Sequence, residues 1–407
     1  MSSWQRFKTS FLKNEFLLIF LTALCLRALA GCLIISTGDD IGEGIREAEE
    51  ILAGNGLVTS MLPEPQAFRN VHPPIFPYSL AASFKLFGHS LEPLRGIYIL
   101  IAALACLLLA DIGKRTMGRA GTLAGWVLAL YPAQIFWSSR VNPFNLMYSL
   151  IVLGMWLALT YSERPRTWLA ALMGLLWASF ALMRTEYFLG SACIVFFLLW
   201  KHRFRCKNAA VFVICLMIGM SPWIARNYAI HKRIIILNLS GSDVLWNTFH
   251  ADYPFDGERK PFTPDLSAAM APVSEMQRND ILFADIKRYV KTHPWRALYI
   301  AIGNLVHFWR PYLAPNAAVV SVTKNLVYTL SYVPIFVFFL LGLRLAPWRD
   351  PFWVFVLTFI LYKALVHWVG YAVVHFREAI VPLMIPIAVL GVIDTWETVS
   401  TMKNREA

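Results

Sequence analysis

The sequence predicts an all-α, polytopic membrane protein: a bundle of about ten transmembrane helices, with amphipathic interfacial helices in extracytoplasmic loops. Two observations predict this class. Hydrophobic residues make up 57% of the 407 positions and charged residues only 15%, which is too little charge to cover the surface of a soluble domain of this length. Several apolar runs approach or exceed the ~18 residues that cross a bilayer. We expect one membrane-embedded domain over residues 1–407.

The predicted transmembrane helices follow the apolar runs. They cover residues 15–36, 94–112, 120–138, 143–160, 167–183, 187–200, 209–226, 325–344, 351–370 and 379–396. Residues Leu29-Ala30-Gly31-Cys32 match a lipoprotein cleavage sequence. However, Arg27 interrupts the apolar run just before them, so we expect the first helix to remain uncleaved.

The placement of positive charge predicts the orientation of the bundle. The net charge of +12 comes largely from short clusters between apolar runs. The clusters contain Lys114, Arg115, Arg119, Arg164, Arg166, Lys201, Arg203, Arg205, Lys207, Arg349, Lys403 and Arg405. All of them lie on one side if the chain begins in the cytoplasm, as the positive-inside rule requires. We therefore expect a plasma (inner) membrane protein with both termini cytoplasmic, and we exclude nucleic acid as a partner.

This orientation leaves two long extracytoplasmic segments, residues 37–93 and 227–324, which hold most polar residues capable of chemistry. Within the second, residues 281–309 are rich in Trp, Tyr and His and predict helices lying along the membrane surface. The alternative is an eleventh span over 297–313, which would break the charge pattern that follows.

Single arginines at the outer ends of four helices depart from the charge rule: Arg140, Arg184, Arg226 and Arg377. Arg27 lies in the outer half of the first helix. An arginine at membrane depth is costly and usually has a partner. Snorkelling to lipid headgroups explains some of these residues. A convergent set instead predicts a bound anionic headgroup, because the guanidinium group binds phosphate through two N–H groups.

The first extracytoplasmic segment opens with two adjacent carboxylates, Asp39 and Asp40. Nearby cations would keep them ionised, and such a carboxylate serves as a general base toward a hydroxyl or amine. Carboxylate oxygens also suit Mg²⁺, Mn²⁺ or Ca²⁺, so the sequence leaves metal dependence undecided. The competing interpretation is a helix cap or a solvated turn.

Other candidate residues come from both segments and from the helix ends. Arg69 and His72 precede Pro73-Pro74, which fixes an extended backbone and presents both basic side chains from a rigid strut. Glu43 and Glu186 are candidate metal ligands or acceptor contacts, with pairing to Arg46 and Arg184 as the alternative. Asn247 is a candidate for the acceptor side.

The order of these features resembles the GT-C fold glycosyltransferases of the family 39-like group, which includes protein O-mannosyltransferases and the lipid A aminoarabinose transferase. Members carry an aspartate after the first helix, an aromatic residue four positions on, an alanine four later and a glycine six beyond. Asp40, Ala48 and Gly54 match this spacing, whereas Gly44 stands at the aromatic position. His72-Pro73-Pro74 matches the family's basic-Pro-Pro motif.

Later stretches resemble the same family more loosely. They are Pro222-Trp223-Ile224-Ala225-Arg226-Asn227-Tyr228, then Ser240-Gly241-Ser242-Asp243-Val244-Leu245-Trp246-Asn247, and His375-Phe376-Arg377 before Pro382. The resemblance covers about residues 15 to 395.

The resemblance implies a GT-C-type helical bundle that transfers a hexose or pentose from a polyprenyl-phosphate sugar to an extracytoplasmic acceptor. The acceptor would be a glycolipid, a polysaccharide or a protein. An inverting displacement is implied, with Asp40 or Asp39 as the base. The residues implied to bind the donor phosphate are Arg69, His72, Arg184 and Arg377. The alternative function is a lipid-linked sugar flippase or another transporter, although transporters usually place polar residues at the midplane and often show internal repeats.

Overall fold

A computed structural model of the chain describes residues 3–34, 41–60, 67–69, 71–251, 261–271, 273–313, 320–370 and 372–406. The predicted all-α class is confirmed: within these residues, strands occur only as the two-residue antiparallel pair β1 (Thr59–Ser60) and β2 (Ala67–Phe68). In the first half of the chain the helices are α1 (Ser3–Ile34), α2 (Gly42–Leu52), α3 (Ile75–Phe87), α4 (Glu92–Met117), η1 (Arg119–Thr122), α5 (Leu123–Leu130), α6 (Pro132–Ser138), α7 (Pro143–Glu163), α8 (Thr167–Met183) and α9 (Glu186–Lys201).

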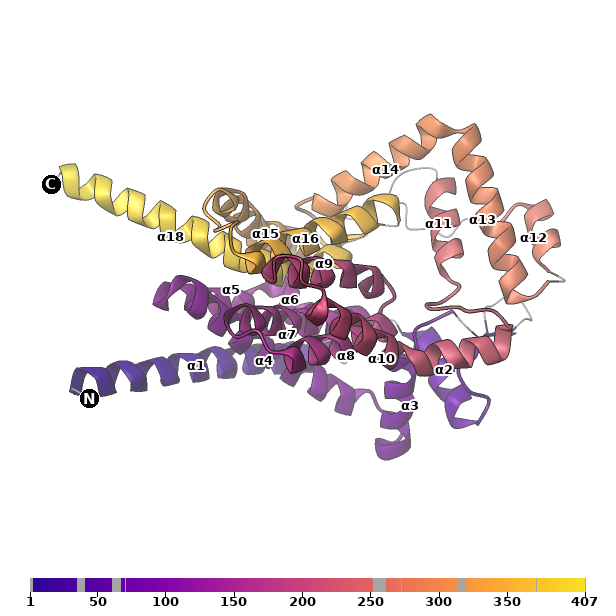
Figure 1. The fold of residues 1–407 in the computed structure, drawn as a ribbon, viewed down its shortest axis with the longest axis horizontal. Coiled ribbons are helices and arrows are strands. Elements are labelled where there is room, and N and C mark those ends of the chain that lie inside the picture. The colour runs from indigo at the N-terminus through magenta and orange to yellow at the C-terminus, as the bar shows by residue number, and fades with distance from the viewer. Residues whose placement is uncertain are drawn as a thin grey trace.

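The second half continues the same pattern. Its helices are α10 (Lys207–His231), α11 (Gly241–His250), α12 (Pro264–Met270), α13 (Glu275–Thr292), α14 (Pro294–Trp309), α15 (Val322–Leu343), α16 (Pro351–Val369), α17 (Val374–Glu378) and α18 (Val381–Glu406). Both chain ends lie at one end of an elongated bundle, and α2 and α11 to α13 lie at the other (Figure 1). We call these the terminal end and the loop end.

Seven helices of the described chain are long and apolar enough to cross a membrane, which confirms a multi-pass, membrane-type protein. The seven segments are Asn14–Leu33, Glu92–Met117, Pro143–Glu163, Lys207–His231, Val322–Leu343, Pro351–Val369 and Val381–Met402. Each corresponds to one of the ten predicted helices. Two more predicted helices exist as α8 and α9, which have 17 and 16 residues.

The one remaining predicted helix, over 120–138, is broken. The structure replaces it with η1, α5 and α6, and the break falls at Tyr131, whose backbone is extended (φ −68°, ψ 111°). The cause is Pro132, which disfavours a helical conformation at the preceding residue and has no N–H to donate to the carbonyl of Leu128. The break therefore leaves backbone acceptors inside the bundle.

Arg27 supplies the missing donors at this break. Its guanidinium group donates to the carbonyl oxygens of Leu128 at 3.0 Å and Ala129 at 3.2 Å, and to the hydroxyl of Ser138 at 3.1 Å. The side chain is only 1% exposed. The prediction that this arginine has a partner is confirmed: it ties α1 to the end of α5 and to α6.

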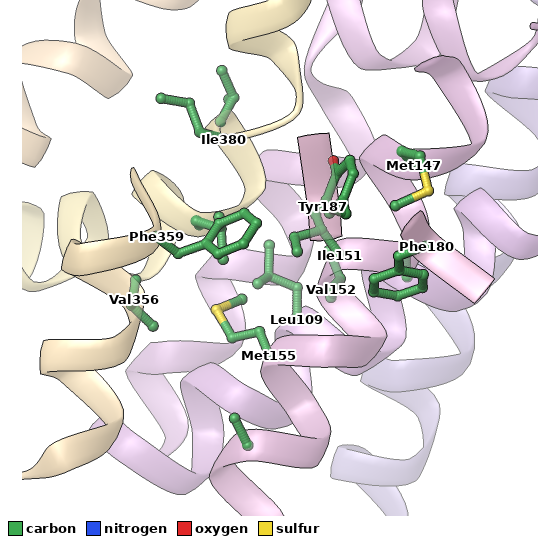
Figure 2. Packing of buried hydrophobic residues seen from close by; sticks show 14 of the residues in the cluster. Leu109, Met147, Ile151, Val152, Met155, Phe180, Tyr187, Val356, Phe359 and Ile380 are labelled. Atoms are coloured by element: carbon green, nitrogen blue, oxygen red, sulfur yellow. The ribbon is translucent and has the colours of Figure 1, made fainter. Parts of the chain in front are cut away.

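The centre of the bundle forms around α7. Buried side chains from α4, α7, α8, α9 and α16 interlock there, including Leu109, Met155, Phe180 and Phe359 (Figure 2). Within the apolar windows, 72% of α7 is buried by other helices but only 22% of α1. In this arrangement α7 is enclosed by protein, and α1 presents most of its surface outward.

Small residues allow α15 and α18 to pack closely. A Cβ atom on Gly342 would overlap the carbonyl oxygen of Ile387, and one on Gly391 would overlap that of Phe338. Glycines at helix interfaces permit this approach in membranes, where van der Waals packing drives helix association.

We expect Gly342→Ala to lower the free energy of unfolding by about 1–3 kcal/mol, because the added methyl group forces the two helices apart. Gly96→Ala in α4 is the matched control, since a Cβ there meets nothing within 4 Å. Unfolding of the purified variants in denaturant is the measurement. Equal midpoints for both variants would contradict the close packing of α15 and α18.

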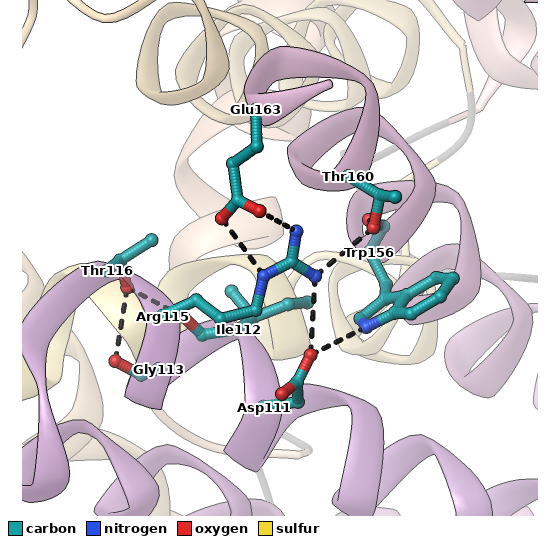
Figure 3. Close-up of polar contacts among 8 residues, drawn as sticks. All are labelled: Asp111, Ile112, Gly113, Arg115, Thr116, Trp156, Thr160 and Glu163. Carbon is teal, nitrogen blue, oxygen red and sulfur yellow. Dashed lines mark hydrogen bonds and ion pairs between the residues drawn. The ribbon is translucent and has the colours of Figure 1, made fainter. Parts of the chain in front are cut away.

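A polar network joins the last turns of α4 and α7 (Figure 3). Arg115 donates to both carboxylate oxygens of Glu163, at 3.0 and 2.7 Å, and also reaches Asp111 at 3.3 Å. Asp111 in turn accepts from the indole N–H of Trp156 at 2.8 Å. These contacts fix the register of two parallel helices, a structural role remote from the loop end.

The helices predicted over 281–309 exist as α13 and α14, which join at His293. One face of α14 exposes Trp295, Tyr299, Ile302 and Val306. This spacing of three to four residues gives a continuous apolar stripe, as expected for an interfacial helix. The helix ends at Trp309 and is not among the seven of membrane-spanning length.

Candidate functional site

The predicted catalytic pair, Asp39 and Asp40, lies outside the described residues. The described chain resumes at Ile41, directly before α2, which packs against α3. There the structure explains one departure from the family pattern. A Cβ on Gly44 would lie 2.9 Å from the ring of Phe76. Phe76, from α3, thus occupies the space beside the position where the family carries an aromatic side chain.

His72 is held between two carboxylates of α2. Its Nδ1 lies 2.7 Å from Oε1 of Glu47, and its Nε2 lies 3.6 Å from Oε2 of Glu43. Glu47 is buried, with 1% exposed, and also accepts a hydrogen bond from Thr59. These contacts connect α2, the β1–β2 pair and the Pro-Pro strut. They also place two carboxylates beside His72, which disfavours binding of a phosphate or another anion there.

The two loop segments are docked on each other. The backbone N–H of Arg69 donates to Glu275 at 3.0 Å, Arg226 donates to the carbonyl of Leu57 at 2.9 Å, and Asn238 donates to the carbonyl of Val71 at 2.6 Å. A shallow pocket lies along this junction. Its lining residues are Phe68, Val71, Leu239, Ser240, Ser242, Asp243, Glu275, Arg278 and Asn279.

The remaining predicted residues of the two segments take different positions. The side chain of Arg69 is exposed, beside the junction. Asn247 is half-buried on α11, and its amide group donates to the carbonyl of Asp243 at 2.9 Å. Neither residue lines the pocket at the junction.

A second pocket brings together charged side chains from three separate parts of the chain. Arg184 follows α8, Glu186 begins α9, and Lys363 comes from α16. The guanidinium group of Arg184 lies 3.1 Å from Oε2 of Glu186, and the ammonium group of Lys363 lies 2.5 Å from Oε1. The other lining residues are Phe144, Met147, Tyr148, Tyr187, Phe376 and Ala379. We call this the cationic pocket.

Aromatic side chains fix the position of Arg184. Its guanidinium carbon lies 3.5 Å from the centre of the Phe144 ring, which is cation–π geometry. His375 also packs against Phe144, with ring centres 5.0 Å apart. Burial and the nearby Arg184 guanidinium lower the pKa of His375 to about 4. The imidazole is therefore neutral at physiological pH and adds no charge beside the pocket.

Arg377 is buried in a network of its own. It donates to the carbonyl oxygens of Phe308 and Arg310 and to the hydroxyl of Tyr328, and none of its side chain is exposed. The Tyr328 hydroxyl donates to Glu378 at 2.6 Å. Burial raises the pKa of the Glu378 carboxyl above its usual range, although Arg377 opposes this shift. This network anchors the short helix that carries Phe376.

Sequence analysis missed two residues that the structure brings into these clusters. Lys363 is a lone cation in the apolar run 351–370, and an isolated charge in a membrane span is a usable signal. Glu47 gives a weaker signal, because it shares one helical face of α2 with Gly44 and Ala48.

Within the described residues, no three or more His, Cys, Asp or Glu side chains are grouped so as to hold a metal ion. Asp39 and Asp40 lie outside these residues.

Comparison with known proteins agrees with the fold. Residues 71–225 match the family of dolichyl-phosphate-mannose-protein mannosyltransferases. The structure is similar to an oligosaccharyltransferase from Archaeoglobus fulgidus that was crystallised with a tethered acceptor peptide containing the NVT sequon. The TM-score is 0.53 at 14% sequence identity, over 98% of this chain and 51% of that enzyme, so the chain spans about half its length. No curated protein matches the chain significantly.

These findings confirm the architecture that the sequence resemblance predicts. The chain has the fold of the GT-C glycosyltransferases, and its segment 71–225 is similar to the dolichyl-phosphate-mannose-protein mannosyltransferases.

Proposed function

We propose that the chain is a membrane glycosyltransferase that moves a hexose or pentose from a polyprenyl-phosphate sugar to an extracytoplasmic acceptor. The observation that carries this proposal is the cationic pocket at the loop end of a GT-C bundle. Arg184 and Lys363 share one carboxylate there, among aromatic side chains. A phosphate group linked to a hydrophobic chain has the chemistry that such a pocket recognises.

The proposed reaction is a single displacement at the anomeric carbon. Asp40, with Asp39 beside it, removes the proton from an acceptor hydroxyl or amine as the acceptor atom attacks. The bond between the anomeric carbon and the phosphate oxygen breaks, and the polyprenyl phosphate leaves with that electron pair. A displacement of this kind inverts the anomeric configuration.

The proposed binding residues have unequal roles. Arg184 lies in the cationic pocket and contacts the donor phosphate. Arg69 is exposed near the segment junction and reaches the donor from the first segment. His72 contacts Glu43 and Glu47. We therefore assign it the role of orienting the first segment. Arg377 supports the pocket through α17, and Asn247 remains a candidate acceptor contact.

The charge pattern supports an orientation with both termini in the cytoplasm of a plasma (inner) membrane protein. The loop end and the cationic pocket then face the outside, where lipid-linked donors replace nucleotide sugars. The acceptor class stays open among glycolipid, polysaccharide and protein.

The test follows the donor lipid, because every acceptor yields the same leaving group. Proteoliposomes containing the purified chain receive a labelled polyprenyl-phosphate sugar and a cell-envelope extract as the source of acceptor. We expect conversion of the donor into free polyprenyl phosphate, and about a 10²-fold slower conversion for Arg184→Gln. Arg344→Gln, at an exposed pair with Asp394 in α18, is the control and should leave the rate unchanged.

A flippase gives the opposite pattern. It would move the intact donor between leaflets without releasing polyprenyl phosphate, even with the extract present. That outcome would replace the transferase proposal with transport.

A further inference from the structure

The cationic pocket contains more positive than negative charge. Two cations, Arg184 and Lys363, contact the same carboxylate of Glu186, so the three groups carry one net positive charge. Lys363 is only 1% exposed, and its ammonium group also lies 5.1 Å from the ring centre of Tyr187. Burying a charge is costly unless it is paired. One ion pair compensates one cation, and the second cation is left over.

The pocket also contains donors without acceptors. The Nε atom of Arg184 and the hydroxyl of Tyr187 are buried and have no hydrogen-bond partner among the described residues. Buried polar groups in native proteins nearly always have a partner, so such an unmet donor calls for an explanation. Both residues line the pocket, and an anion that contacts both side chains would satisfy these donors and balance the excess charge.

Glu186 is not held by the cations alone. Its backbone carbonyl accepts a hydrogen bond from the Tyr362 hydroxyl, one residue before Lys363. Glu186 also begins α9, where a carboxylate is favoured by the helix dipole. These features fix the backbone of Glu186 beside the pocket and favour a carboxylate at this position.

We propose that Arg184, Lys363 and Glu186 form a phosphate-binding site in which Glu186 is a built-in counter-anion that sets how much negative charge the site accepts. This inference rests on the proposed function, because it assigns the charge balance of the same pocket. A phosphodiester carries one negative charge and matches the site. The phosphate monoester released by transfer carries a charge of about −1.5 to −2. This exceeds the single positive charge of the pocket, so Glu186 repels the product. The carboxylate thus weakens product binding and aids release.

A charge series tests this proposal directly. Lys363→Gln reduces the net charge of the pocket to zero, Glu186→Gln raises it to two, and the double variant restores one. The probe is farnesyl phosphate, measured as a ligand of the purified chain in detergent and as an inhibitor of donor conversion. Inorganic phosphate and an anionic phospholipid are compared with it, to separate a lipid phosphate from a free ion or a bulk headgroup.

We expect Lys363→Gln to weaken farnesyl phosphate binding about tenfold or more, as for loss of one charge-assisted hydrogen bond. Glu186→Gln should tighten binding and lower kcat through retained product, and KM should fall together with kcat because slow product release lowers both. The double variant should bind within a few-fold of the unaltered chain, and Lys363→Arg should preserve binding. Size-exclusion profiles of the variants confirm folding.

The result that would overturn the proposal is a double variant as weak as Lys363→Gln alone. Glu186 and Lys363 would then be a structural ion pair, because the charge count would have no influence. Equal competition by inorganic phosphate and farnesyl phosphate would also overturn the assignment to a lipid phosphate. Failure of the transferase proposal looks different: the binding series holds, while no variant converts the donor.

Discussion

Replacing both Asp39 and Asp40 with asparagine is expected to slow sugar transfer by about 10²- to 10⁴-fold, the usual contribution of a general base. Asparagine keeps the size of the side chain but cannot accept the proton of the acceptor. Of the single variants, Asp40→Asn should show the larger loss, since Asp40 matches the family spacing to Ala48 and Gly54. The measurement is the rate at which polyprenyl phosphate is released from the labelled donor.

The control separates loss of the base from loss of the fold. If farnesyl phosphate binds in the cationic pocket as proposed, its binding should change little in the double asparagine variant. Asp394→Asn, at the exposed pair with Arg344, should leave both binding and transfer intact. Transfer retained by the Asp39/Asp40 double variant would rule out the base assignment.

The second large effect concerns stability. We expect Arg27→Leu to lower the free energy of unfolding by about 2–6 kcal/mol, because the carbonyls of Leu128 and Ala129 would each lose a donor, at about 1–3 kcal/mol apiece. The measurement is unfolding of the purified chain in denaturant, or its yield in folded form. Arg27→Lys should recover part of the loss, because an ammonium group reaches fewer of these acceptors.

Arg344→Leu is the matched control for that experiment, since its guanidinium group is exposed and makes one surface ion pair. Such pairs contribute about 0–1 kcal/mol. If Arg27→Leu and Arg344→Leu unfold at the same denaturant concentration, the hydrogen bonds of Arg27 do not stabilise the break between α5 and α6.

The sequence predicts the fold well where periodicity and charge act locally. Nine of the ten predicted helices exist as helices, because long apolar runs have no stable alternative in a bilayer. Pro132 is a sequence signal for the interruption. However, an apolar run that contains a proline is also compatible with one kinked helix. What decides between them is the buried guanidinium of Arg27, more than one hundred positions away in the chain.

The candidate site was predictable only in part. Arg184 and Glu186 are two positions apart, so their pairing was a reasonable expectation, and the structure confirms the contact. Lys363 contacts Glu186 from 177 positions further along the chain. No local sequence pattern gives the distance between α9 and α16. The same holds for Glu47, whose partner His72 becomes a neighbour only when the strut folds back over α2.

The docking of the two loop segments has a consequence for protein engineering. Three hydrogen bonds between described residues join this region, from Arg69 to Glu275, from Arg226 to Leu57 and from Asn238 to Val71. Each hydrogen bond uses a backbone group of the first segment, so compatibility depends on the path of its main chain as well as on side chains such as Phe68, whose ring centre lies 5.1 Å from the Arg278 guanidinium carbon. A chimera designed to recognise a new acceptor must therefore exchange both segments together, with the outer turn of α10.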